Sequence, residues 1–216
     1  MLFGSYQVVD VLLLVGNVAP VALYFLALGL VNSHSRPYLI TRRADFVALT
    51  IVLVPVIFWP LPKFLYSGSW WPLIPSGCLL AGLFFWMLPR AGDGFVVYNI
   101  AEAKFMRALD GALAAIRLSG SWEGKTWRSD CGRLTLHVRG FAMLRNVTLH
   151  IEGADAERFC HTLGGELNDR LASIAQLPSS TGAGLVLVGL GLMILPMWTV
   201  SRHIDDLVDA MLHLFG

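Results

Sequence analysis

The chain has 216 residues, of which 56% are hydrophobic and only 14% are charged, against about 25% charged residues in typical soluble domains. Its formal net charge of +1 and its pI of about 7.8 exclude a protein that binds nucleic acid through a large excess of positive charge. The charged residues gather between Arg90 and Arg170, and the flanking segments carry few of them. This division predicts membrane segments on either side of a water-facing part.

Four apolar stretches predict four transmembrane helices, at about residues 8–31, 46–65, 70–88 and 182–200. About 20 apolar residues in helical form cross the hydrocarbon layer, which is the length of these stretches. No Lys or Arg precedes the first stretch, so it does not have the basic start of a cleaved signal peptide. The predicted fold class is therefore a membrane protein with about four transmembrane α-helices and a small two-layer α+β domain inserted between the third and fourth.

The predicted organisation has three parts. Residues 1–90 hold the first three helices, residues 91–179 form the α+β domain, and residues 180–216 hold the fourth helix and an amphipathic C-terminal helix over 201–215. That last helix places apolar residues on one face and Asp205, Asp206 and Asp209 on another. The outer membrane surface and a neighbouring subunit are equally suited to receive the apolar face.

The positive charges predict the orientation. The segment between the first two stretches holds Arg36, Arg42 and Arg43, whereas the segment between the second and third holds only Lys63. Because cytoplasmic loops carry the excess of Lys and Arg, the first loop and residues 91–179 are expected in the cytoplasm, with both termini outside. In a bacterium this membrane would be the inner membrane.

Amphipathic periods predict the elements of the domain. Residues 95–98 and 126–129 read as strands, and residues 101–118 as a helix with one apolar face. Aliphatic and polar residues alternate over 134–139 and 146–151, which predicts a hairpin with Leu136 opposite Leu149. A second helix follows Asp155. Both helices are expected on one face of the sheet, as in a two-layer sandwich.

Two groups of residues are candidate contacts for a partner protein or for lipid headgroups. His137, Arg139 and His150 share the polar face of the predicted hairpin, with the two histidines placed diagonally. The arginines of the first loop, already named, form the second group, although orientation alone would account for them. The histidines lack the close paired spacing of a zinc site, and no motif for RNA binding is present.

Small residues at short spacings predict helix packing in the third and fourth stretches. They are Gly77, Ala81, Gly82, Gly182, Gly184, Gly189 and Gly191. Such stripes allow close approach of helices within one chain, in a homo-oligomer or against other membrane-protein subunits.

The sequence contains no P-loop, nucleophile elbow, zinc-protease, dinucleotide-binding or calcium-loop motif. We therefore expect no catalytic residue, cofactor or metal, and favour a protein that is not an enzyme. The leading hypothesis is a non-catalytic subunit or scaffold of a membrane complex, whose cytoplasmic domain binds a protein partner. The alternatives are a membrane-embedded enzyme or carrier that acts on lipid-like or anionic substrates through the basic first loop, and a ligand sensor.

Overall fold

A computed structural model describes residues 2–58, 71, 73–175 and 180–215. The chain divides into two compact units. The first, here called the helical unit, comprises Met1–Ala27, Leu49–Trp86 and Leu185–Gly216. The second, here called the domain, comprises Leu28–Ala48 and Met87–Gly184.

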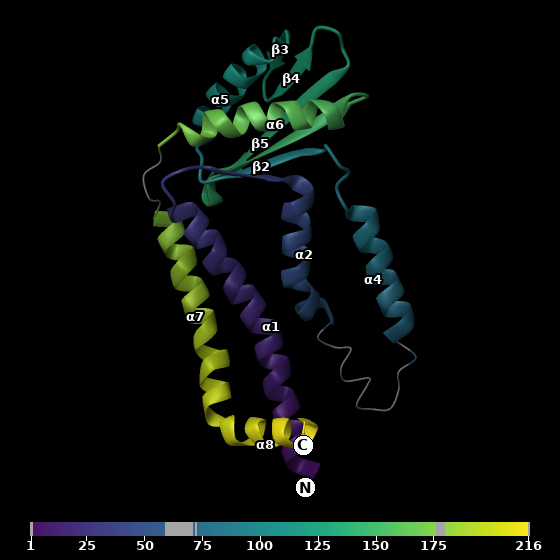
Figure 1. The fold of residues 1–216 in the computed structure, drawn as a ribbon, viewed down its shortest axis with the longest axis vertical. Helices are drawn as coiled ribbons and strands as arrows, with labels where there is room; N and C mark the ends of the chain where they lie inside the picture. Colours follow the sequence, from purple (N-terminus) through teal and green to yellow (C-terminus); the bar gives the residue numbers. More distant parts are fainter. Residues whose placement is uncertain (1, 59–70, 72, 176–179, 216) are drawn as a thin grey trace. The chain divides into compact units, whose positions relative to one another are not determined.

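The domain contains one six-stranded antiparallel sheet with the strand order β1-β2-β6-β5-β4-β3 (Figure 1). The strands are β1 (Tyr38–Thr41), β2 (Gly94–Tyr98), β3 (Gly120–Glu123), β4 (Thr126–Ser129), β5 (Leu134–Phe141) and β6 (Asn146–Gly153). The four inner strands lie at predicted positions, and the two edge strands were not predicted. Neither edge strand, with the sequences YLIT and GSWE, alternates apolar and polar residues as a half-buried strand does.

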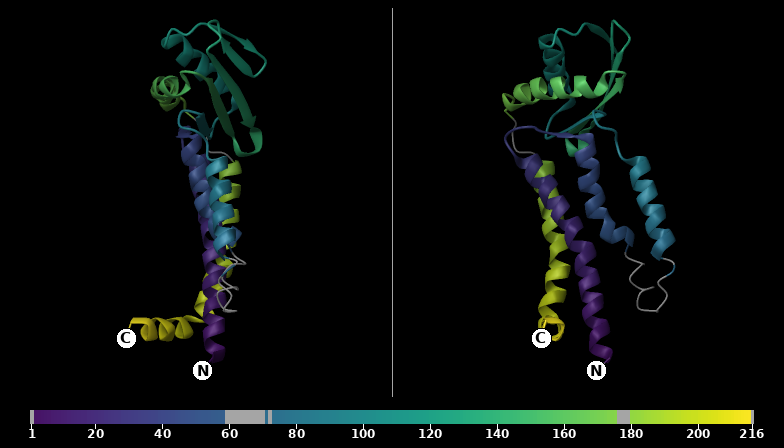
Figure 2. Two further views of the ribbon diagram at one scale, coloured as in Figure 1. Left: turned by 90° about the vertical axis from the view of Figure 1, so that its right-hand side faces the viewer. Right: turned by 45° about the vertical axis from the view of Figure 1, so that its right-hand side comes forward.

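Helices α5 (Glu102–Ala115) and α6 (Ala156–Ala172) cover one face of this sheet, as predicted (Figure 2). Leu109 of α5, Leu163 of α6 and Leu136 of β5 are completely buried between the layers. Burying one such side chain contributes about 1.5–3 kcal/mol, so this contiguous apolar layer fixes which face the helices cover.

The β5–β6 hairpin has a different register from the predicted one. Leu136 pairs with Ile151, and Val138 pairs with Leu149. A shift of two residues keeps every side chain on its own face, so the alternation alone does not distinguish these registers. The correction places His137 directly opposite His150 rather than diagonally from it.

The remaining helices are α1 (Leu2–Ser33), α2 (Arg42–Phe58), α4 (Leu73–Met87), α7 (Ser180–Arg202) and α8 (Ile204–Phe215). The prediction of four transmembrane helices is wrong. In the part of the chain that the structure describes, two helices are long and apolar enough to cross a membrane, at Asp10–Ser33 and Ser180–Arg202.

The other two predicted spans fail for separate reasons. At about 1.5 Å per residue, the 15 residues of α4 reach about 22 Å, short of the roughly 30 Å hydrocarbon layer. Helix α2 has 17 residues and begins with Arg42, Arg43 and Asp45, and its first residues belong to the domain. The predicted ends of these spans over 59–70 and at 72 lie outside the described residues.

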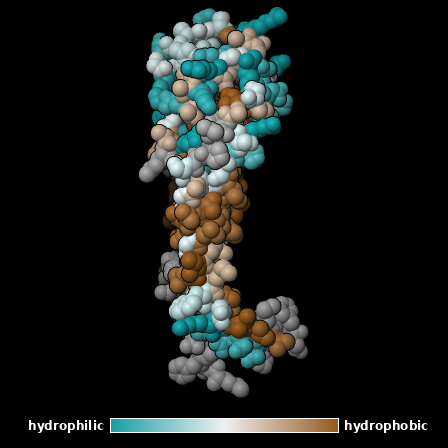
Figure 3. Space-filling view, turned by 90° about the vertical axis from the view of Figure 1, so that its left-hand side faces the viewer, coloured by the Kyte–Doolittle hydropathy of each residue, from teal (hydrophilic) through white to brown (hydrophobic). Residues whose placement is uncertain are grey.

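The two long helices are apolar but scarcely buried. In each, only 11% of the most apolar 18-residue window is buried within the chain, whereas the core helix of a soluble protein is mostly buried. Apolar side chains dominate the surface of the helical unit, and hydrophilic ones most of the visible domain surface (Figure 3). Length, composition and exposure together suit a lipid environment.

Helix α7 packs against α1 through two of the predicted small residues. A Cβ atom added to Gly189 would lie 2.7 Å from Cγ of Leu26 and 2.9 Å from the carbonyl oxygen of Ala22. A Cβ on Gly182 would lie 2.5 Å from Oγ of Ser33. Gly184 and Gly191 have open space beside them, as do Gly77 and Gly82 of α4, and Ala81 is exposed. These five residues make no close helix contact within the described chain.

The C-terminal helix α8 is amphipathic, as predicted. Its first turn holds Asp205 and Asp206, and Ile204, Val208 and Leu212 leave 54%, 49% and 66% of their surfaces exposed. These three apolar residues are four positions apart and therefore share one side of the helix.

Candidate functional site

The face of the sheet opposite α5 and α6, here called the helix-free face because neither of these two helices covers it, carries rows of side chains that cross several strands. One row contains Val96, Thr148 and Arg139, and a second contains His150, His137 and Thr126. The first turn of α2 lies over part of this face, because the Tyr98 hydroxyl donates a hydrogen bond of 2.6 Å to Oδ1 of Asp45.

The two histidines stack across β5 and β6, with ring centroids 6.3 Å apart and an interplanar angle of 27°. Glu152 lies beside both rings. Its Oε1 is 3.0 Å from Nε2 of His150, and its Oε2 is 3.8 Å from Nε2 of His137. Nδ1 of His137 contacts the Thr126 hydroxyl at 3.0 Å. Each nitrogen of the His137 ring therefore already has a polar neighbour.

His150 also joins three separate parts of the domain. Its Nδ1 lies 2.8 Å from Oδ1 of Asp93 and contacts Nη1 of Arg42. The same guanidinium nitrogen of Arg42 is 2.7 Å from Oδ2 of Asp93. Arg42 thus connects the start of α2 to the segment before β2 and to β6.

Two glycines hold Asp93 in this position. Gly92 has a φ of +79°, and a Cβ there would lie 2.4 Å from the Cα atom of Glu157. Gly94 has a φ of +130°, and a Cβ there would lie 1.9 Å from the carbonyl oxygen of Leu149. Only glycine suits this combination of conformation and close approach. The backbone of Asp93 accepts a 3.0 Å hydrogen bond from the amide of Ile151.

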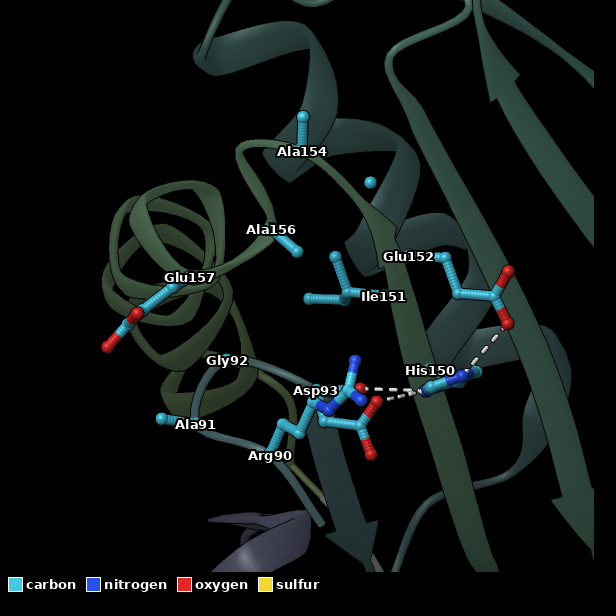
Figure 4. A pocket seen from close by; sticks show the side chains of 11 residues that line it. Arg90, Ala91, Gly92, Asp93, His150, Ile151, Glu152, Ala154, Ala156 and Glu157 are labelled. Carbon is cyan, nitrogen blue, oxygen red and sulfur yellow. Dashed lines mark hydrogen bonds and ion pairs between the residues drawn. The ribbon is translucent and has the colours of Figure 1, made fainter.

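Two hollows flank His150. The first, here called the face hollow, measures about 400 Å³ and is lined by Arg42, His137, Arg139, Thr148, His150 and Glu152. The second, here called the end hollow, measures about 490 Å³ and lies between the segment before β2, the end of β6 and the start of α6. Figure 4 shows His150 between Asp93 and Glu152 at the side of the end hollow, and Glu157 pointing away from them.

The structure thus brings four of the six predicted contact residues together and leaves two apart. Arg42, His137, Arg139 and His150 line the face hollow, whereas Arg36 and Arg43 are exposed and line neither hollow. The segment that holds these arginines is not simply a loop, because it contains β1. Sequence reasoning missed Asp93, Thr148 and Glu152. The alternation of β6 places the last two on the polar face, but nothing in the sequence brings Asp93 to the same place.

The domain contains two cysteines with different surroundings. Burial raises the pKa of the Cys160 thiol to about 11. Cys131 is exposed, and a hydrogen bond with Ser129, followed by one from the backbone at Arg133, lowers its pKa from the ordinary thiol value. The Ser129 oxygen lies 2.8 Å from Sγ of Cys131. Cys131 is therefore the more readily ionised of the two thiols.

Among the residues that the structure describes, no three His, Cys, Asp or Glu side chains converge on a position that could hold a metal ion. The paired histidines and Glu152 make an electrostatic cluster that positions side chains on the sheet surface. What remains available to a ligand is the guanidinium and hydroxyl lining of the face hollow.

Comparisons with models of protein families, with curated proteins and with solved structures found no match to this chain.

Proposed function

We propose that the chain is a non-catalytic, membrane-anchored subunit or scaffold whose domain binds a protein partner through the helix-free face of its sheet. The observation that carries the proposal is the contrast between the two sides of the sheet. Two helices cover one side, while the other presents Arg139 and the histidine pair at an accessible surface. A sheet face that is only partly covered and presents an exposed arginine suits docking of a partner, because arginine is enriched at protein interfaces.

The anchor in this proposal consists of α1 and α7, which flank the domain in the chain. Arg36, Arg42 and Arg43 follow α1 closely and Arg170 precedes α7, whereas Arg202 is the one Lys or Arg at the other ends of these helices. This asymmetry of basic residues near the membrane ends favours the cytoplasm for the domain and the opposite side for both termini. The expected location is a cell membrane, the inner one in a bacterium, with lipids and other membrane subunits or further copies of the chain as neighbours.

A photo-crosslinking amino acid tests the partner surface. Introduced in place of Arg139, on the helix-free face, it should give a discrete protein adduct in intact membranes. The matched control replaces Arg158, which is exposed on α6 of the opposite layer, and should give none. Adducts of equal yield at both positions would contradict the proposal, as would turnover of a substrate by the purified chain alone.

The second candidate is an enzyme or carrier that acts on lipid-like or anionic substrates. The position of Arg42 at the face hollow favours it. Separate substitution of Arg36, Arg42 and Arg43 distinguishes the two functions. A substrate site requires that a single change abolish activity while the chain still inserts correctly, whereas a role in orientation requires partial and additive misinsertion.

A further inference from the structure

The side chains around the face hollow differ in whether their polar groups are already used. Arg139 of β5 and Thr148 of β6 are directly opposite each other. Within the described residues, neither side chain has a hydrogen-bond or ion-pair partner, and Arg139 is exposed. The Arg139 guanidinium and the Thr148 hydroxyl therefore lie on neighbouring strands and can both donate hydrogen bonds to a ligand.

The acidic groups nearby already have partners. Asp93 pairs with Arg42 at 2.7 Å, and Glu152 lies against the rings of both histidines, which balance its charge only when they are protonated. Within the described residues, Arg139 is the arginine of this hollow that has no acidic partner. A guanidinium without an acidic partner attracts an anion.

The two histidines line the hollow, and their ring nitrogens are not expected to bind the ligand. Both nitrogens of His137 and both nitrogens of His150 contact neighbouring polar atoms. Arg42 contributes differently, because its contacts with Asp93 and His150 use Nη1 alone. Its other guanidinium nitrogens remain as donors, and Arg42 lines the hollow.

The geometry points to the face hollow as a site for a phosphate group, bound by Arg139, Thr148 and Arg42. Three donor groups from three different elements suit the several oxygens of a phosphate better than the two oxygens of a carboxylate. Arginine forks match phosphate oxygens in paired, charge-assisted hydrogen bonds. The volume of about 400 Å³ leaves room for an organic group attached to the phosphate, as in a soluble phosphate ester or a lipid headgroup.

This assignment goes beyond the proposed partner binding and is independent of it, because a titration with purified chain contains no partner. The test is isothermal titration of the full chain in nanodiscs of phosphatidylcholine, with inorganic phosphate, glycerol 3-phosphate and acetate as separate titrants. We expect saturable binding of the two phosphates, and weaker binding of acetate.

Arg139→Ala should weaken the binding of phosphate by about tenfold or more, because it removes charge-assisted hydrogen bonds. Thr148→Val should weaken it by a smaller factor. The matched control, Arg158→Ala, should leave it unchanged, and equal unfolding temperatures of the two arginine variants would show that the fold is intact. Equal affinity of Arg139→Ala and the unsubstituted chain, equal affinity for acetate, or no saturable binding would overturn the assignment.

A second set of nanodiscs, which contain phosphatidic acid, identifies the source of the phosphate group. Loss of glycerol 3-phosphate binding in these nanodiscs, restored when phosphatidic acid is omitted, assigns the site to a lipid headgroup. Unchanged binding assigns it to a soluble phosphate ester. The crosslinking experiment at position 139 stays informative in either case, because it reports a protein partner and not a small ligand.

Discussion

The domain buries a core of apolar residues within the chain, whereas the helical unit leaves many of its apolar residues exposed. Leu163 of α6 is completely buried between helix and sheet, whereas Leu187 of α7 keeps 69% of its surface exposed. The domain supplies its own apolar interior and can satisfy the hydrophobic effect within the chain. The long helices cannot do so, and their exposed apolar surface needs lipid or other helices. The difference shows that a high content of apolar residues does not by itself give the number of membrane spans.

Truncation of one leucine in each unit should give the largest difference in stability between the two units. Leu136→Ala leaves a cavity in the domain core and should lower the free energy of unfolding of the domain by about 2–5 kcal/mol. Leu187→Ala should change it by less than about 0.5 kcal/mol. Chemical unfolding followed by near-ultraviolet circular dichroism measures both. Equal losses for the two variants would contradict the assignment of Leu136 to a closed core.

Disrupting the packing of α7 against α1 should give the next largest loss of stability. Gly189→Leu forces a side chain into Leu26 and the backbone at Ala22 and should cost about 1–3 kcal/mol of overpacking. Spin labels at Leu23 and Leu187, both exposed, should then show a longer or broader distance distribution by pulsed electron resonance. Gly191→Leu is the matched control, because open space lies beside Gly191. If both substitutions change the distance distribution equally, a specific contact of Gly189 with α1 is contradicted.

The adjacent arginines at the start of α2 both belong to the domain and differ in their contacts with it. Arg42→Ala removes an ion pair with Asp93 whose side chains are 28% and 19% exposed, and should destabilise the domain by about 1–2 kcal/mol. Amide hydrogen exchange in β1 should rise with it. Arg43→Ala, at an exposed neighbour, should leave both quantities unchanged. If Arg43→Ala has the larger effect, Arg42 does not tie β1 to the sheet.

The two domain cysteines provide the smallest and most local test. Cys131 should be alkylated at lower pH than an ordinary thiol, because its lowered pKa supplies thiolate earlier as the pH rises. Cys160, with a pKa of about 11, should stay unreactive across the neutral range. Ser129→Ala should move the pH midpoint for Cys131 upward. Iodoacetamide rates measured against pH in Cys78→Ser chains check this, and identical profiles for the two thiols would contradict it.

Most of the domain could be predicted because its elements bury one face. The stripe that includes Phe159 and Leu163 predicts α6, and the alternation on either side of Gly140 predicts the β5–β6 hairpin. The register of that hairpin could not be predicted, because a two-residue shift preserves the buried face. Strands β1 and β3 could not be predicted either, since neither YLIT nor GSWE shows the alternation of a half-buried strand.

The candidate site was predictable only in part, for a related reason. The alternating pattern places His137, Arg139 and His150 on one surface. The approach of Arg42 and Asp93 depends on the pairing of β1 with β2 and on the glycines around Asp93, which are contacts between distant parts of the chain. The number of membrane spans was overestimated because hydropathy counts apolar residues without regard to helix length or to the sheet that holds the start of α2.

The most direct test of the account compares the environments of α7 and of the helix-free face in one preparation. Nitroxide labels at Leu187→Cys and Arg139→Cys, in otherwise cysteine-free chains in nanodiscs, report collisions with lipid-soluble oxygen and with a water-soluble nickel chelate. We expect the label at 187 to collide mainly with oxygen and the label at 139 mainly with nickel. Equal access of the nickel chelate to both positions would contradict a membrane anchor that carries a water-exposed binding domain.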